Sequence, residues 1–157
     1  MGYNLFRWRG DVLNIKFRPF EPVSDWGWVN EICPIVYCED TSGIMAYDTD
    51  TFKTIGAFMM DNWTANSVQC HLMTTTPLLL RHGFLEYCAD YVYNVRGVDN
   101  VYALVPANNE KAIKLDYHMG YKLKARLENA FEKGVDYLLM GMKREECIFL
   151  PKQEKVI

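Results

Sequence analysis

The stretch VYALVPANNEKAIKLDYHMGY, residues 101–121, decides the fold. Its first five residues are apolar and rich in β-branched and aromatic side chains, which predicts a buried strand. Asn108 or Asn109 can cap the helix that follows, because a side-chain oxygen there accepts a backbone N–H of the first turn. Gly120 ends this helix, since glycine adopts the left-handed conformation at little cost. The stretch therefore predicts a strand, a capped helix and a further strand from Tyr121.

The segments on either side of this stretch complete one layered fold. Alternating apolar residues indicate strands, apolar residues at helical spacing indicate helices, and Gly, Pro, Asn and Asp separate them. The order predicts a mixed α/β (α+β) fold with a mostly antiparallel sheet of six or seven strands flanked by helices. The expected elements are a strand at 15–20, a helix at 25–32 capped by Ser24, strands at 43–47, 54–63 and 67–73, a long helix at 78–95, the strand and helix of 101–121, strands at 121–127 and 135–142, and a loop at 128–134.

Composition restricts the function classes. With 157 residues, half of them hydrophobic, the chain is long enough for one domain with a sizeable core. A net charge of −3 gives no indication of nucleic-acid binding, which needs a basic surface. No apolar run approaches the roughly 20 residues of a membrane span, so no membrane association is expected. Five cysteines without a C-x-x-C motif favour reduced thiols in a cytoplasmic protein.

The opening stretch also carries a family resemblance. Asn109, Ala112, Gly120 and Tyr121 match, at its spacing, the Asn-x-x-Ala, helix, Gly-aromatic pattern of the GNAT acyltransferase superfamily. The order of elements from 15 to 143 is similar to the GNAT order too. This resemblance implies a GNAT-like domain at 15–143. Residues 1–14 mix aromatic and charged side chains without a clear period and are expected to form an N-terminal arm, and the charged tail at 144–157 is expected to be loosely held. The chain also resembles small GNAT proteins encoded by tailed bacteriophages, which implies a host-cytoplasmic protein or, alternatively, one placed in a virion.

The resemblance implies acetyl-coenzyme A (acetyl-CoA) as cofactor, held between the fourth and fifth strands and at the start of the long helix. In the family a loop with two glycines binds the pyrophosphate through backbone N–H groups. Here the corresponding segment 74–83 lacks both glycines, and Gly83 is expected inside the helix. Either threonine hydroxyls and Arg81 substitute for the glycines, or the cofactor has been lost. The expected cofactor-binding residues are Leu72, Met73, Thr74, Thr75, Thr76, Arg81 and Asn109.

Three residues are candidates for catalysis. The family's tyrosine acid corresponds in spacing to Asp116, with Tyr117 next to it on another helix face. An aspartate donates a proton at neutral pH only if burial raises its pKa. The alternative is that Asp116 is solvated and Tyr117 packs. His71, on the strand 67–73, is a candidate general base because imidazole titrates near neutral pH. Its alternative role is a cleft histidine satisfied by one hydrogen bond.

The sequence thus supports two hypotheses from different classes. The first is a GNAT-like N-acyltransferase that moves an acetyl group from acetyl-CoA to an amine on a small molecule or a protein. The second is a GNAT-shaped structural or interaction protein of a phage without catalysis, because the loop glycines and the tyrosine acid are both replaced. Self-association is compatible with either hypothesis. The three histidines are dispersed, so no metal site is predicted, although His71 with nearby carboxylates remains an alternative.

Overall fold

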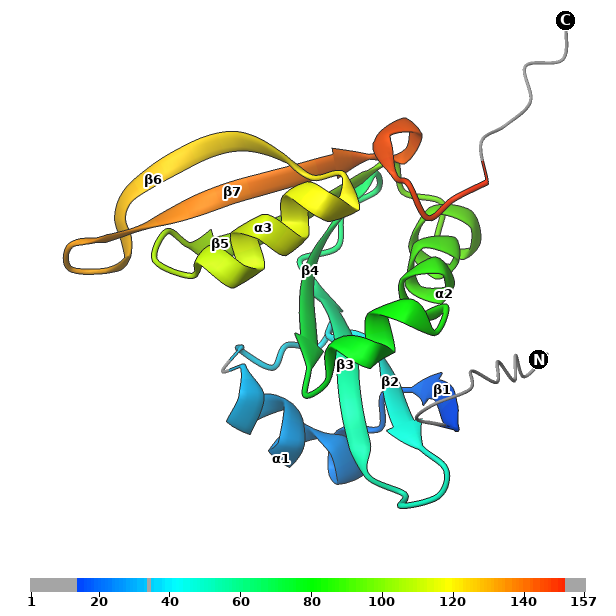
Figure 1. The fold of residues 1–157 in the computed structure, drawn as a ribbon. Helices are drawn as coiled ribbons and strands as arrows, with labels where there is room; N and C mark the ends of the chain where they lie inside the picture. The colour runs from blue at the N-terminus through cyan, green and yellow to red at the C-terminus, as the bar shows by residue number, and fades with distance from the viewer. Residues whose placement is uncertain (1–13, 34, 152–157) are drawn as a thin grey trace, which may run out of the picture. The chain divides into compact units, whose positions relative to one another are not determined.

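The computed structural model describes residues 14–33 and 35–151, and these form a single mixed sheet with flanking helices (Figure 1). The strands are β1 (Ile15–Pro19), β2 (Ser42–Asp48), β3 (Thr54–Asp61), β4 (Ser67–Thr74), β5 (Asn100–Pro106), β6 (Lys122–Glu132) and β7 (Val135–Lys143). The helices are α1 (Pro22–Ile32), α2 (Phe84–Asp90) and α3 (Glu110–Met119), with short helical turns η1 (Pro77–Arg81), η2 (Tyr91–Val95) and η3 (Arg144–Glu146). The hydrogen-bonded order is β1-β2-β3-β4-β5-β7-β6, with β4 and β5 parallel. The expected α/β fold and sheet are confirmed.

The chain divides into two compact units. Unit 1 consists of the residues up to Asn62 together with His71–Cys88, and unit 2 consists of Trp63–Cys70 together with the residues from Ala89 onward. The strand β4 and the helix α2 therefore contribute residues to both units. In the described ranges, no helix is long and apolar enough to cross a membrane.

Unit 1 is built on the antiparallel strands β1, β2 and β3, in which Phe17 lies opposite Ala46 and Ile44 opposite Phe58. Apolar side chains from alternate strand positions and from α1 meet on one face, as the period of two along a strand requires. The buried residues of this core are Phe20, Val29, Met45, Ala57, Met59 and Met73. The core of unit 1 thus brings together residues as far apart in the chain as Phe20 and Met73.

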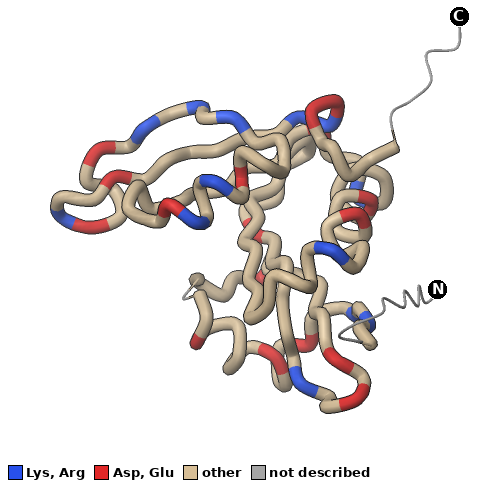
Figure 2. Tube along the Cα trace, in the orientation of Figure 1, with Lys and Arg blue, Asp and Glu red and all other residues tan. Residues whose placement is uncertain are grey.

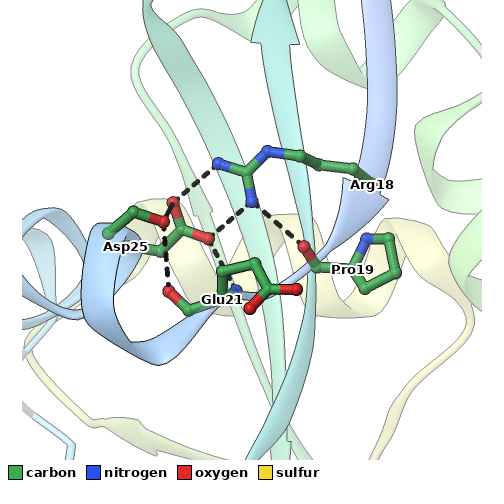
Figure 3. A network of polar contacts seen from close by, with 5 residues as sticks. Arg18, Pro19, Glu21 and Asp25 are labelled. Carbon is green, nitrogen blue, oxygen red and sulfur yellow. Dashed lines mark hydrogen bonds and ion pairs between the residues drawn. The ribbon is translucent and has the colours of Figure 1, made fainter.

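The helix α1 begins at Pro22, earlier than expected, and Ser24 does not cap it. Proline suits a first helical position because no intrahelical bond needs its missing N–H. The carboxylate of Asp25 instead accepts the Glu21 N–H at 2.8 Å and a two-point ion pair from Arg18 at 2.6 and 2.7 Å (Figure 3). Burial alone would raise the pKa of Asp25, but the hydrogen bonds from Arg18 and Glu21 outweigh it and lower the pKa below its usual value. This contact fixes the start of α1 to β1.

The prediction of one long helix at 78–95 is wrong. It is divided into η1, a turn, α2 and the π-helical η2, in which the Arg96 N–H bonds to the Tyr91 carbonyl at 2.9 Å. Gly83 has a φ of +78°, and its carbonyl accepts the Tyr87 N–H at 3.0 Å. A residue in the left-handed region cannot continue a right-handed helix. Gly83 therefore precedes the first turn of α2, and its expected place inside a helix is corrected.

Unit 2 contains the stretch 101–121 and confirms its interpretation. The strand β5 is central, with Val101 opposite Met142 and Val105 opposite Leu138 on β7. The side-chain oxygen of Asn109 accepts the Ala112 N–H at 3.2 Å, which caps α3. Gly120 ends the helix with a φ of +105°. The β5–α3 unit is therefore encoded locally, by the strand composition, the cap and the terminal glycine.

Two expectations for the C-terminal part are wrong. The strand β6 extends to Glu132, so most of the loop expected at 128–134 is strand, and the turn is shorter. The residues after β7 are also well anchored: Lys122 pairs with Glu146 at 2.6 Å, and the Arg144 guanidinium donates to the Tyr93 carbonyl and to Asn94. A loosely held tail is thus wrong for Arg144–Glu146. The arm at 1–13 and the tail residues 152–157 lie outside the described residues.

Candidate functional site

The side chain of His71 forms a hydrogen bond with a carboxylate group. Its Nε2 atom lies 2.9 Å from Oδ2 of Asp61, at the end of β3. Both side chains are largely buried, with exposed fractions of 15% for His71 and 9% for Asp61. The other carboxylate oxygen of Asp61 accepts the side-chain amide of Asn62 at 3.2 Å. A carboxylate on one imidazole nitrogen orients the ring and leaves Nδ1 to exchange a proton, which is how a general base is commonly arranged.

The turn after β4 is held by its own threonines. The Thr74 hydroxyl donates to the Thr76 carbonyl at 2.6 Å, and the Thr75 hydroxyl donates to the Ile55 carbonyl at 3.2 Å. The hydroxyl oxygen of Thr76 accepts the Leu78 N–H at 3.3 Å and so caps the start of η1. Because each hydroxyl has one proton, the first two threonines already use their donors within the protein. Their side chains shape the turn, and Thr76 keeps a proton to donate.

The segment between this turn and α2 presents open backbone at Gly83. A Cβ atom added at this glycine would meet no atom within 4 Å, which leaves space beside its peptide groups. Arg81 is the last residue of η1, and its side chain is exposed. It brings a permanent positive charge to the same segment. An open glycine and a cation before a helix are the features by which backbone N–H groups approach a phosphate. The combination depends on the left-handed conformation of Gly83, which places this glycine before the helix.

In unit 2, Asp116 is buried and Tyr117 is exposed. The alternative of a solvated Asp116 and a packed Tyr117 is therefore wrong. Asp116 is buried with an exposed fraction of 8%, and its Oδ2 atom has no hydrogen-bond partner among the described residues. Tyr117 is exposed, at 52%. Neighbouring residues on a helix point about 100° apart, so only one of them can enter the core. Desolvation raises the pKa of Asp116 to about 7, and the carboxyl therefore holds a proton in slightly acidic solution.

The remaining sequence candidates have mainly structural roles in their own units. Leu72 and Met73 lie on β4, and Met73 belongs to the core of unit 1. Asn109 uses its side-chain oxygen to cap α3. The fold joins His71 to Asp61 in unit 1, while it separates the buried Asp116 from the exposed Tyr117 in unit 2. Among the described residues no group of three or more His, Cys, Asp or Glu side chains could hold a metal.

Two functional candidates were missed from sequence: Asp61 and the loop position of Gly83. A signal for Asp61 was present, because the hairpin turn expected at 64–66 brings residue 61 across from residues near 70. A search for acids on the partner strand would have found it. No comparable local signal placed Gly83, since the apolar residues before it continue the helical pattern.

Comparison with solved structures finds the same fold in acetyltransferases. A structure of spermidine/spermine N-acetyltransferase SpeG from Vibrio cholerae with manganese ions is 15% identical, covers 83% of this chain and 93% of its own, and has a TM-score of 0.67. A mutant of the V. cholerae spermidine N-acetyltransferase is also 15% identical and covers 89% and 98%, with a TM-score of 0.71. A dodecameric structure of that enzyme in an intermediate state has the same identity and coverage and a TM-score of 0.68.

These comparisons establish the fold. No protein-family model matches the chain, and no curated protein sequence does. At 15% identity, structural likeness shows how the chain is folded and not what it does. The chain therefore has the GNAT fold that the stretch 101–121 indicated, and its chemistry has to be argued from its own side chains.

Proposed function

We propose that the protein is an N-acetyltransferase that moves an acetyl group from acetyl-CoA to an amine. The observation that carries this proposal is the contact between His71 and Asp61, at 2.9 Å. Placing a buried carboxylate against a largely buried imidazole costs desolvation, which a purely structural histidine on a sheet does not need. The pair favours catalysis over a GNAT-shaped protein without activity.

His71 is the proposed general base. An amine in water at neutral pH is mostly protonated and has no lone pair for attack, so a proton has to leave it first. Nδ1 of His71 can accept that proton directly or through one water, while Asp61 on Nε2 stabilises the imidazolium that results. Acetyl-CoA, when bound, supplies the thioester carbonyl that the amine attacks. The protein's contribution to that attack is mainly to position and deprotonate the amine.

Asp116 is the proposed proton donor for the departing thiolate, and the exposed phenol of Tyr117 is the second candidate. The burial that raises the pKa of Asp116 to about 7 answers the objection that an aspartate is ionised at neutral pH. Its Oδ2 atom is buried and accepts no hydrogen bond from the described residues, so no such donor holds the carboxyl in its ionised form. Asp116 therefore suits the acid role in acidic to neutral solution.

The residues present are compatible with the cofactor. The β4 backbone at Leu72, Met73 and Thr74 is proposed to bind the pantetheine arm. The open backbone at Gly83 and the charge of Arg81 suit the pyrophosphate, and Thr76 retains a hydroxyl proton for it. The hydroxyls of Thr74 and Thr75 support this loop from within rather than bind the phosphates.

The acceptor is proposed to be a small aliphatic amine. The structural neighbours act on spermidine, according to their names, and the chain's net charge of −3 favours a cation over an anion. Spermidine is therefore the first amine to test.

The function is tested by measuring the release of CoA thiol from acetyl-CoA with spermidine or spermine, alongside the thermal unfolding of the protein with acetyl-CoA. Cofactor at about 100 times its dissociation constant would stabilise the fold by about 2.7 kcal/mol. His71→Ala should lower turnover by about 10²–10⁴-fold, the usual range for a general base. His118→Ala, at an exposed position of α3, is the matched control and should leave turnover unchanged. If millimolar acetyl-CoA produces no thermal stabilisation and no thiol release, the proposal is refuted.

The acid is identified by comparing Asp116→Asn with Tyr117→Phe at pH 6. Loss of turnover in the first variant alone assigns the proton to Asp116, and loss in the second alone assigns it to Tyr117. Unchanged turnover in both removes both residues from the mechanism.

The cofactor loop has an internal control. Gly83 and Gly134 both adopt a positive φ, +78° and +85°, and an added Cβ at either glycine would meet no atom within 4 Å. Alanine should therefore cost each site a similar backbone strain of about 1 kcal/mol. Only Gly83→Ala should weaken acetyl-CoA binding, because its methyl group occupies the proposed phosphate approach. Equal affinities in the two variants would contradict the proposed loop.

A further inference from the structure

The residue that follows β3, Asn62, has a left-handed backbone conformation, with a φ of +49°. In this region the Cβ atom of an ordinary residue crowds the following carbonyl, so residues other than glycine, asparagine and aspartate rarely adopt it. A left-handed residue cannot continue an extended strand. The strand β3 therefore ends at Asp61, and the chain turns directly after this carboxylate.

The side chain of Asn62 contacts the carboxylate that precedes it. Its amide nitrogen donates to Oδ1 of Asp61 at 3.2 Å, while Oδ2 of the same carboxylate lies 2.9 Å from Nε2 of His71. An ionised carboxylate can only accept hydrogen bonds, so the amide has to present its nitrogen and the imidazole a protonated Nε2. Each oxygen of the Asp61 carboxylate thus has its own donor.

This hydrogen bond limits the rotation of the Asp61 carboxylate. The torsion between Cβ and Cγ of an aspartate has a broad energy profile, so the carboxylate turns easily when nothing holds it. Such a rotation would move Oδ2 away from His71 even if the backbone stayed in place. A donor on Oδ1 opposes the rotation, and hydrogen bonds to charged groups are stronger than those between neutral groups.

The backbone conformation alone does not require an asparagine at residue 62. Glycine adopts a positive φ with less strain, and aspartate is tolerated there as well. Of these three residue types, only asparagine can also donate a hydrogen bond to a carboxylate at neutral pH, because glycine has no side chain and ionised aspartate has no proton. The donated bond to Asp61 therefore favours a role in the candidate site over a role in the turn alone.

We propose that Asn62 is a positioning residue that fixes the plane of the Asp61 carboxylate, and through it the orientation of the His71 imidazole. This inference rests on the proposed role of His71 as general base. A base acts efficiently when supporting hydrogen bonds hold it in one geometry. The amide takes no part in the bond changes: the proton passes from the amine to Nδ1 of His71, and Asn62 keeps both of its own.

The test compares two replacements of Asn62 in the full chain. Asn62→Gly keeps the backbone conformation and removes the donor, and Asn62→Asp keeps the shape and replaces the donor with an acceptor. Each should lower turnover of acetyl-CoA with spermidine by about tenfold or more, the factor that corresponds to a lost hydrogen bond to a charged group. The thermal stabilisation by acetyl-CoA should not change. Wild-type turnover in either variant would overturn the proposal.

A double-mutant cycle shows whether Asn62 acts through Asp61. Asp61→Asn should lower turnover by itself, because it removes the carboxylate that orients His71. Adding Asn62→Gly to it should cause no further loss, since the amide then has no carboxylate to hold. Losses that multiply in the double variant would mean that Asn62 acts independently of Asp61, which contradicts the proposal.

Asn129 supplies a matched control in β6. Its φ is +51°, it follows an acid, Glu128, and its side-chain oxygen accepts the Gly134 N–H at 2.8 Å. Figure 2 shows acidic positions in this part of β6, toward the turn into β7. Asn129→Gly should therefore leave turnover unchanged while it removes a comparable side-chain bond. If it lowers turnover as much as Asn62→Gly does, a general loss of stability explains both and the proposal fails.

The proton on Nε2 of His71 gives a readout that needs no turnover. It lies between two largely buried side chains, so it should exchange slowly with water and give a sharp NMR signal in protein with ¹⁵N-labelled histidine. The signal is assigned by its loss in His71→Ala. It should persist in Asn129→Gly and broaden or vanish in Asn62→Gly, and a signal that stays equally sharp in Asn62→Gly would overturn the proposal.

The NMR and turnover measurements together separate this inference from the proposed function. If the signal broadens in Asn62→Gly but acetyl-CoA and spermidine give no thiol release with any variant, the positioning contact stands and the proposed function fails. If His71→Ala lowers turnover while Asn62→Gly keeps both the signal and full turnover, the proposed function stands and the role of Asn62 is refuted.

Discussion

Replacing Asp116 with asparagine should change how the stability of the protein depends on pH. Desolvation raises the pKa of this carboxyl from 3.8 to about 7. Between these values the folded protein holds a proton that the unfolded chain has lost. The stabilisation is therefore complete below about pH 4 and disappears as pH rises through about 7. One pKa unit corresponds to about 1.4 kcal/mol, so the folded state loses about 4 kcal/mol across this range because of one carboxyl.

Asparagine has nearly the same shape and cannot ionise. The Asp116→Asn variant should therefore escape this loss, and its unfolding free energy relative to wild type should rise by about 4 kcal/mol between pH 4 and pH 8. Urea denaturation at several pH values measures the difference directly, since other titrating groups are common to both proteins. The gain in stability should therefore be found at pH 8, where the wild-type carboxyl is largely ionised, and any loss of turnover at pH 6, where the wild-type carboxyl still holds its proton.

Asp136 supplies a control of opposite sign. The Asn129 N–H and the Arg126 guanidinium lower the pKa of this carboxyl, so its contribution to stability is present at neutral pH and lost on acidification. Asp136→Asn should therefore lose stability mainly at neutral pH. If the wild-type and Asp116→Asn profiles run parallel from pH 4 to pH 8, the reasoning about a buried protonated carboxyl is refuted.

Three further substitutions test the fold by their unfolding free energies in urea. Arg18→Met should cost about 3 kcal/mol, because it leaves the Asp25 carboxylate buried without its cation, and adding Asp25→Leu should restore much of the loss. Gly120→Ala should cost more than about 2 kcal/mol, since left-handed strain adds to an approach of 2.6 Å between the new Cβ and the Glu146 carbonyl. Asn109→Ala should cost about 1 kcal/mol through the lost helix cap. Changes below 0.5 kcal/mol, the ordinary surface range, would contradict each assignment.

Much of the fold could be predicted because its signals are local. The strand β5 follows from five apolar residues in succession, and α3 follows from the Asn109 cap and Gly120. The β3–β4 hairpin follows from its turn residues. Where local signals conflicted, prediction failed: the leucines after Pro77 continue a helical pattern, yet Gly83 turns left-handed and separates η1 from α2.

The candidate site was predicted less well than the fold. His71 was singled out from its residue type and strand position, but its partner Asp61 lies ten residues away on another strand, and only the folded hairpin joins them. The predicted strand at 121–127 is shorter than β6, because the exposed residues of β6 lack the alternation that marks a half-covered strand.

By itself, the sequence determined the order of strands and helices and the GNAT-like unit at 101–121, because caps, glycines and apolar periodicity act over a few residues. Only the tertiary structure decided that Asp116 is buried and protonated near neutral pH while Tyr117 faces solvent. Both residues suit an amphipathic helix, and the choice between them depends on which face of α3 meets the rest of unit 2. Desolvation is a property of that packing, so no local pattern could have revealed the pKa of Asp116.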